Sequence, residues 1–130
     1  MRDRQNAKGL CTQGACKKLP VIGAVRCAEH LLLIKVWRKD NKISCINKYG
    51  GRCRCCKITI LDFLTIDHIK DDGAIQRKRN PEQAKNIHLY LKKKKYPKGY
   101  QILCANSQLG KVIGKGFCPH HPKIDLRIPQ

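Results

Sequence analysis

Short apolar runs and longer stretches of spaced apolar residues divide the chain into predicted strands and helices. Residues 63–69 and 100–104 are rich in apolar, β-prone side chains and predict two strands, and residues 57–60 predict a shorter one. Spaced apolar positions through 28–47 predict a long helix. It ends at residues 49–51, since the two glycines there readily adopt the left-handed conformation that closes a helix. The pattern therefore indicates a small α+β protein.

Residue types mark the ends of two further helices. The first is predicted to begin at Asn80, because Asn80 is a good N-cap, Pro81 suits the first helical position and Gln83 completes a capping box. Four lysines at 92–95 fill its last turn, where the helix dipole favours cations. Residues 105–113 predict a short helix that follows the second strand directly.

The strand predicted at 63–69 ends in two polar residues. Asp67 places a carboxylate, and His68 an imidazole, side by side at the end of an apolar stretch. Successive strand residues point to opposite faces of a sheet, so the two cannot both be core residues. One can ligate a cation while its neighbour transfers a proton. In the alternative interpretation, both simply begin the turn at residues 70–73.

The chain is strongly basic. Its 28 Lys and Arg outnumber its nine Asp and Glu, which gives a formal net charge of +19. A positive electrostatic field of this strength attracts phosphate groups, so nucleic acid is the expected partner. With one Trp and two Phe, base stacking is expected to contribute little, and Trp37 is expected to pack in the core. The expected phosphate-binding side chains are Lys35, Arg38, Lys39, Lys42, Lys92, Lys93, Lys94, Lys95 and Lys111.

Cysteine usage indicates metal binding rather than disulfides. Nine cysteines cannot all pair, and residues 1–13 are too polar and charged for a signal peptide. The longest apolar run, residues 31–34, is far too short to cross a bilayer. We therefore expect reduced thiolates that bind zinc in an intracellular protein without a membrane segment.

Two groups of residues have the spacing of zinc ligands. The first has the pattern C-x4-C-x10-C-x2-H, in which each short-range pair can hold one edge of a tetrahedron. Its members are Cys11, Cys16, Cys27 and His30. Alternatively, Cys27 is buried in the apolar face of the long helix and His30 is free. The second group contains Cys53 and Cys56, whose C-x-x-C spacing places two thiolates on one side of a tight turn.

Four segments together resemble the HNH endonuclease family, and most closely the small HNH proteins of phages and mobile introns. They read YGGRC (49–53), CC (55–56), FLTIDHI (63–69) and YPKGYQILCAN (96–106), and their order and spacing agree with the family as well as their residue types. The resemblance implies three parts. Residues 1–47 form a basic arm, a zinc module and a connecting helix, residues 48–121 an HNH domain, and residues 122–130 a tail. It also implies a bacterial or phage-infected cell, or an organelle, as the location.

The resemblance further implies a zinc-stabilised ββα-metal fold, in which two antiparallel strands and a helix hold one Mg²⁺ or Mn²⁺ ion. By position, His68 matches the general base that activates water, and Asp67 matches a carboxylate ligand of the metal. These roles suit the side chains, because a neutral imidazole accepts a proton near pH 7 and hard oxygen ligands hold Mg²⁺. The family's structural zinc lies between two C-x-x-C pairs, which Cys53, Cys56 and Cys104 match in part.

The chain departs from the family pattern at Gly99, where the family has its middle Asn, and at two positions that bear on the metal sites. Ser107 stands where the fourth zinc thiolate belongs, and a neutral hydroxyl is a weak zinc ligand, so Cys118 is the expected replacement. The alternatives are Cys55, His120 and His121. Gln108 stands where the helix supplies a metal-binding Asn or His, and Asn106 is the alternative ligand there. One or two structural zinc ions are therefore expected per chain.

Two functions are compatible with these features. The first is a metal-dependent endonuclease that hydrolyses phosphodiester bonds, of DNA rather than RNA, with the Asp67-His68 pair at its centre. The second is a degenerate HNH fold that binds nucleic acid without catalysis, RNA within a larger nucleoprotein assembly included. The first is the expected function, whereas the changes at Ser107 and Gln108 and the high positive charge are the features that point toward the second.

Overall fold

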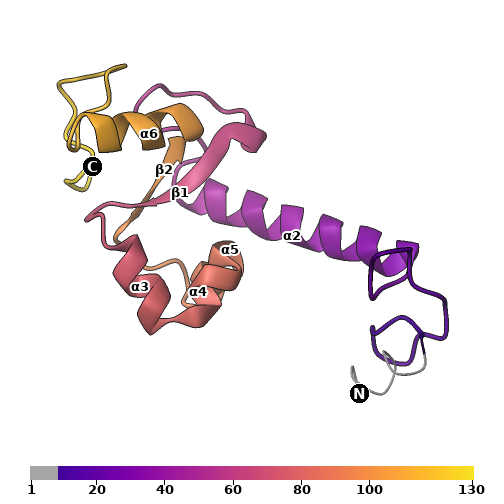
Figure 1. Ribbon diagram of the computed structural model, residues 1–130. Helices are drawn as coiled ribbons and strands as arrows, with labels where there is room; N and C mark the ends of the chain where they lie inside the picture. Colours follow the sequence, from indigo (N-terminus) through magenta and orange to yellow (C-terminus); the bar gives the residue numbers. More distant parts are fainter. Residues whose placement is uncertain (1–8) are drawn as a thin grey trace. The chain divides into compact units, whose positions relative to one another are not determined.

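The computed structural model describes residues 9–130, and the chain divides into two compact units. Unit 1 is Met1–Asp40 and unit 2 is Asn41–Gln130. The elements are α2 (Ala28–Lys48), the 3₁₀ helix η1 (Leu61–Phe63), β1 (Leu64–His68), α3 (Gly73–Arg79), α4 (Pro81–Lys85), α5 (Ile87–Lys93), β2 (Tyr100–Cys104) and α6 (Ala105–Ile113) (Figure 1). The fold is α+β, as predicted. Among the described residues, none of the helices combines the length and the apolar composition that a membrane span requires.

Unit 2 is built on a two-stranded antiparallel sheet. β1 pairs with β2 in a register that joins Leu64 to Cys104 and His68 to Tyr100, so both long predicted strands are confirmed. α6 begins at the residue after β2, as predicted, and packs against both strands. The sheet and α6 together position the Asp67-His68 pair at one end of β1.

The third strand predicted, at residues 57–60, does not form. Lys57 adopts a positive φ of 66°, and the N–H of Cys53 donates to the carbonyl of Ile58. These two features turn the chain back on itself, so residues 53–58 form a loop that carries three cysteines close together.

The helix predicted from Asn80 is divided in two. Asn86 has an extended backbone with φ −157° and separates α4 from α5, and its side chain caps α5 by accepting from the N–H of Leu89. Pro81 opens α4 as predicted, whereas the side chain of Asn80 makes no capping hydrogen bond. The capping box assigned to Gln83 is wrong, because this side chain is buried and bonded to other polar groups of unit 2.

The long helix α2 is confirmed, and the residues that it buries lie near its C-terminal end. They are Asn41, Cys45 and Ile46. Trp37 was expected in the core but is 47% exposed. It precedes the buried positions by a full turn, so the contribution of α2 to the core of unit 2 comes from its last two turns.

The core of unit 2 combines short aliphatic side chains with thiols. Its buried members are Cys45, Ile46, Cys53, Cys55, Leu64, Ile66, Leu91, Ile102, Leu103, Cys104, Cys118 and Leu126. Five of these twelve are cysteines and none is Phe or Trp, so small side chains make up much of the fully buried core. Metal coordination by the thiols would add stability that such a core lacks.

Candidate functional site

A first cluster of metal-ligating groups lies in unit 1. The ligand atoms of Cys11, Cys16, Cys27 and His30 all lie within 4.8 Å of one another. His30 Nδ1 is 3.2 Å from Cys27 Sγ and 3.5 Å from Cys11 Sγ. The loop is closed by the N–H of Cys11, which donates to the carbonyl of Lys18, while the first turn of α2 supplies His30.

The chemistry of this cluster suits zinc. Three thiols and one imidazole can provide the tetrahedral ligand set of a structural zinc site. Burial opposes ionisation of the Cys11 thiol, but hydrogen bonds from the backbone of Cys27 and Gln13 and from the His30 ring outweigh it and lower the pKa of Cys11 to about 6. The structure brings the four predicted ligands together, so the alternative that leaves His30 free does not describe it.

A second cluster lies in unit 2, where the loop before β1 meets the start of α6. The Sγ atoms of Cys53, Cys56 and Cys104 lie within 4.8 Å of one another, with Cys56 and Cys104 3.5 Å apart. The buried Oγ of Ser107 is 3.4 Å from Cys53 Sγ and 3.3 Å from Cys104 Sγ. The hydroxyl thus lies beside the thiols where the family pattern has a fourth thiolate. Three thiols and a hydroxyl could hold a zinc ion.

The thiols of the second cluster differ in how readily they ionise. Burial opposes ionisation of Cys53, but the Ser107 hydroxyl and the backbone of Cys104 and Cys56 outweigh it and lower the pKa of Cys53 to about 7. Burial raises the pKa of the Cys56 thiol above its usual value. A metal ion binding here would meet one thiol, Cys53, that ionises readily near neutral pH and would displace the proton of another, Cys56.

Cys118, the expected fourth ligand of the second cluster, lies in a different group. Its Sγ is 3.4 Å from Nδ1 of His120, and the Sγ of Cys55 completes a set whose ligand atoms lie within 4.8 Å of one another. The prediction for Cys118 is corrected accordingly, because the Ser107 side chain already occupies the position beside Cys53. His121 is not a member of either group.

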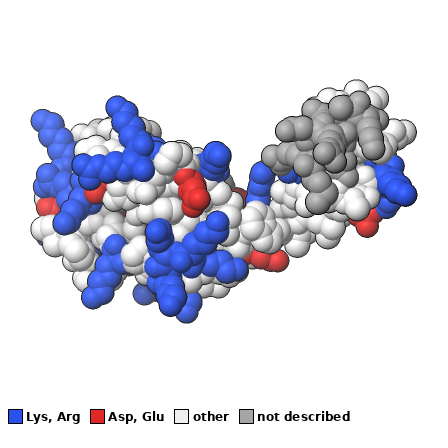
Figure 2. Space-filling model, turned by 90° about the horizontal axis from the view of Figure 1, so that it is seen from below, with Lys and Arg blue, Asp and Glu red and all other residues white. Residues whose placement is uncertain are grey.

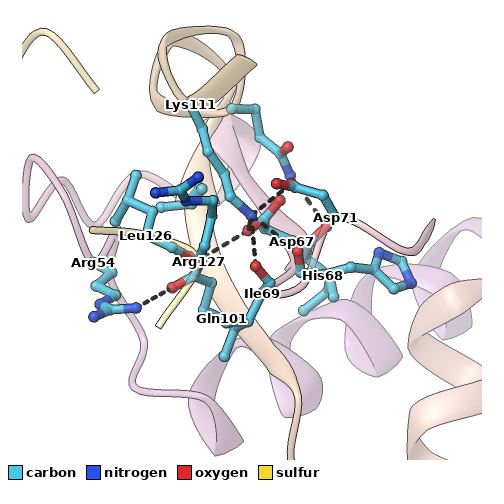
Figure 3. Close-up of polar contacts among 12 residues, drawn as sticks. Arg54, Asp67, His68, Ile69, Asp71, Gln101, Lys111, Leu126 and Arg127 are labelled. Carbon is cyan, nitrogen blue, oxygen red and sulfur yellow. Dashed lines mark hydrogen bonds and ion pairs between the residues drawn. The ribbon is translucent and has the colours of Figure 1, made fainter. Parts of the chain in front are cut away.

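Asp67 is held by a buried lysine. Its Oδ2 accepts from Nζ of Lys111 at 2.7 Å (Figure 3). The side chain of Lys111 is 2% exposed, and its ammonium also lies 2.9 Å from Oδ1 of Asp71. It donates as well to the carbonyls of His68 and Ile69, at 2.9 and 3.2 Å. The ammonium therefore has four oxygen neighbours, two of them carboxylates, which is the kind of ligand set that a divalent cation takes.

The fixed ammonium changes what Asp67 can do. A Mg²⁺ ion at Oδ2 of Asp67 would lie beside a buried positive charge that water does not screen, and like charges repel strongly in such surroundings. Lys111 was also expected to contact nucleic acid. This expectation is corrected, because the side chain is buried and all of its donors are directed at protein oxygens.

His68 points away from this ion pair, as Figure 3 shows, and is 7% exposed. Its ring contacts Tyr100 edge-on at 5.0 Å between centroids, and Nε2 lies 3.0 Å from Oε1 of Gln83. The amide nitrogen of Gln83 donates to Gln76 and to the Tyr100 hydroxyl, so its oxygen faces His68 and can accept a hydrogen bond from Nε2. The other nitrogen, Nδ1, lies against Gly73, where a Cβ would be only 2.8 Å away.

Gln108 and Asn106 on α6 were the other expected metal ligands. Nε2 of Gln108 donates to Oγ1 of Thr65 at 3.0 Å and to the carbonyl of Ile66 at 3.2 Å, whereas Asn106 is exposed. Thr65 and Asp67 are two residues apart on β1 and share a face. Gln108 therefore lies on the same side of the sheet as Asp67, with its amide nitrogen bonded to β1.

The predicted phosphate-binding lysines and arginines of α2 are largely accessible. Lys35, Arg38 and Lys39 are exposed, and Lys42 is half-buried. The four lysines at 92–95 are exposed at the end of α5 and just beyond it.

Sequence reasoning missed half of a larger basic surface in unit 2. The segment 73–95 between β1 and β2, here called the basic insertion, forms α3, α4 and α5, and α4 contacts both of the others. Its eight Lys and Arg and single Glu give a net charge of +7. The eight are Arg77, Lys78, Arg79, Lys85, Lys92, Lys93, Lys94 and Lys95, all exposed. The run at 77–79 was the signal for the missed half, since three consecutive cations end α3.

The cations of the basic insertion have no acidic partners. Within residues 9–130, none of the eight takes part in an ion pair. Figure 2 views the side of unit 2 that carries α3–α5, and Lys and Arg clearly outnumber Asp and Glu on it. A surface of this kind is suited to a partner that carries many negative charges.

Comparison with known proteins finds no counterpart. No protein-family model, curated protein or solved structure matches the chain. Function is therefore inferred from the metal-ligating clusters, the Asp67–Lys111 pair and the basic insertion.

Proposed function

We propose that this chain is a zinc-stabilised, HNH-like protein that binds nucleic acid without hydrolysing it. The antiparallel pair β1–β2 followed by α6 agrees with the ββα arrangement that the HNH resemblance implies. The cluster of Cys53, Cys56 and Cys104 joins the loop before β1 to the end of β2, where zinc would hold the two parts together.

Binding would occur through phosphate groups. The basic insertion presents eight exposed cations that have no acidic partner in the described part of the chain, and each phosphate that they neutralise would release a counterion. The one large aromatic ring of the insertion, Tyr90, is half-buried, so stacking of unpaired bases has little support there. These features favour the backbone of duplex DNA as the partner.

The observation that carries the proposal is the position of the Lys111 ammonium. It lies among the oxygens of Asp67, Asp71 and two backbone carbonyls, where a catalytic cation would have to bind. The protein thus supplies its own fixed positive charge at the carboxylate that an HNH enzyme uses for its metal. The position of His68 also supports a protein without catalysis, because its ring is within hydrogen-bonding distance of Gln83 on the other side of β1.

A metal-dependent HNH endonuclease is the second candidate. It is favoured by the placement of Asp67 and Gln108 on one side of the sheet, close to the helix that the family uses for metal binding. In this function, Lys111 would have to leave Asp67 when the metal and the substrate bind, and His68 would have to release Gln83.

Binding through the basic insertion predicts a loss of affinity when its lysines are neutralised. Replacing all four lysines at 92–95 with Gln should weaken binding to a short DNA duplex by at least about 10-fold near 100 mM salt. It should also reduce the slope of log Kd against log salt concentration by up to about 3.6, because as many as four fewer counterions are released. Fluorescence anisotropy at several salt concentrations measures both quantities.

The matched control neutralises the same number of lysines outside the insertion. Lys57, Lys98, Lys115 and Lys123 are all exposed residues of unit 2 and serve this purpose when changed to Gln. This control should retain most of the affinity. Equal losses in the two variants would mean that only the overall charge matters, and the insertion would not be the binding surface.

A further inference from the structure

We infer that Cys55, Cys118 and His120 form a metal site of their own, a zinc site separate from the cluster of Cys53, Cys56 and Cys104. The inference is independent of whether the protein binds or cleaves nucleic acid. It is carried by the convergence of two thiols and an imidazole nitrogen, all within 4.8 Å of one another. These are the ligand types that structural and catalytic zinc sites share.

The two thiols are brought together by the core and not by their sequence spacing. Cys55 lies in the loop before β1 and Cys118 in the segment after α6, and both side chains are 1% exposed. Two buried thiols could simply be small core residues. Here, however, His120 is exposed and still directs Nδ1 to within 3.4 Å of Cys118 Sγ, an arrangement that an apolar packing role would not need.

The neighbouring helix leaves room for the Cys118 thiol. Gly110 on α6 faces it, and a Cβ at this position would lie 2.7 Å from Cys118 Sγ and 3.0 Å from Pro119 Cδ. The N–H of His121 donates to the carbonyl of Cys118 and closes the turn that carries His120 back toward the thiols. Both features fix the direction of the Cys118 side chain.

Ser107 separates this site from the second cluster. Its hydroxyl lies beside Cys53 and Cys104 on one side and also contacts Cys55, which in turn contacts Cys118. Cys53 and Cys55 therefore serve different groups although they are two residues apart. Three protein ligands would fill three of the four tetrahedral coordination positions of zinc and leave the fourth open. The exposure of His120 places the site at the surface. The fourth ligand of the bound zinc would be water or a group from outside the chain.

Zinc analysis of the full-length, metal-loaded protein tests the inference. We expect three zinc ions per chain, one for each Cys/His cluster. His120→Ala removes an exposed ligand without disturbing the core and should lower the content by one ion. His121→Ala removes the adjacent exposed imidazole, which belongs to no cluster, and should leave the content unchanged.

Replacement of zinc by Co²⁺ identifies the ligands, because thiolate-to-cobalt absorption scales with the number of bound sulfurs. His120→Ala and Cys55→Ser should each lose the spectrum of one site and leave the spectra of the other two. If Cys118 instead ligates the second cluster, Cys118→Ser would remove one ion whereas His120→Ala would remove none. That result, or a wild-type content of two ions, would overturn the inference.

Discussion

Replacing Lys111 with Met should lower the free energy of unfolding of unit 2 by about 3–5 kcal/mol. Methionine fills a similar volume but leaves the buried carboxylate of Asp67 without its cation and strips two backbone carbonyls of a donor. The amide of Gln101 still donates to Oδ2 of Asp67 at 2.7 Å, but a buried carboxylate that loses its counterion is among the most costly defects that a single substitution can create. Chemical denaturation followed by circular dichroism measures the change.

Two further variants show whether the charge is the cause. Adding Asp67→Asn to Lys111→Met removes the unpaired charge and should recover a large part of the lost stability. Lys115→Met changes an exposed lysine in the turn just after α6 and should alter the unfolding free energy by no more than about 0.5 kcal/mol. If Lys111→Met costs less than about 1 kcal/mol, the ammonium does not hold Asp67, and the carboxylate is available to a metal ion.

Removal of zinc by a strong chelator should unfold unit 2. Five of the twelve core residues of this unit are cysteines, and a thiol buries less apolar area than Leu, Ile or Phe would, so we expect the metal to be needed to hold the sheet and α6 together. Structural zinc sites contribute of the order of 10 kcal/mol to the folded state at neutral pH. Hydrogen exchange of the β2 backbone amides, measured before and after chelation, shows directly whether the unit unfolds.

A substitution at Ser107 should have the opposite effect and strengthen zinc binding. Ser107→Cys places a fourth thiol beside Cys53 and Cys104. Zinc should then resist higher chelator concentrations than in the natural chain, because thiolate is a far better zinc ligand than a neutral hydroxyl. Unchanged protection of β2 after complete zinc removal would show that packing alone stabilises the unit.

Local patterns were sufficient for the main elements of the fold. β1 lies within the stretch predicted at 63–69, β2 coincides with the one predicted at 100–104, and the helix that follows directly at 105–113 is α6. The ligand spacing at Cys11 to His30 also predicted a group that the structure brings together. In each case, residues close in sequence carry the whole signal.

Features that depend on distant contacts were not predictable in the same way. Gln83 satisfies the pattern of a capping box, but its amide forms hydrogen bonds with His68 and Tyr100, and these contacts override the local preference. Asn86 breaks the helix because it caps α5 instead. α3 was missed since its residues follow a turn and carry few apolar side chains.

Lys111 and Cys118 show the same limit at the candidate site. A lysine on a short helix normally faces solvent, and only the packing of α6 against β1 brings it to Asp67, 44 residues earlier in the chain. Cys118 was assigned by counting missing ligands, which cannot distinguish between two adjacent clusters. Ser107, lying between them, decides the outcome.

The most direct test combines binding and cleavage in one preparation. A supercoiled plasmid is incubated with the zinc-loaded protein in Mg²⁺ or Mn²⁺, and complex formation and nicking are measured in parallel for the natural chain and for His68→Ala. We predict that both proteins bind the plasmid and that neither nicks it above the background without protein. Metal-dependent nicking by the natural chain that His68→Ala abolishes would contradict the proposal and establish an endonuclease.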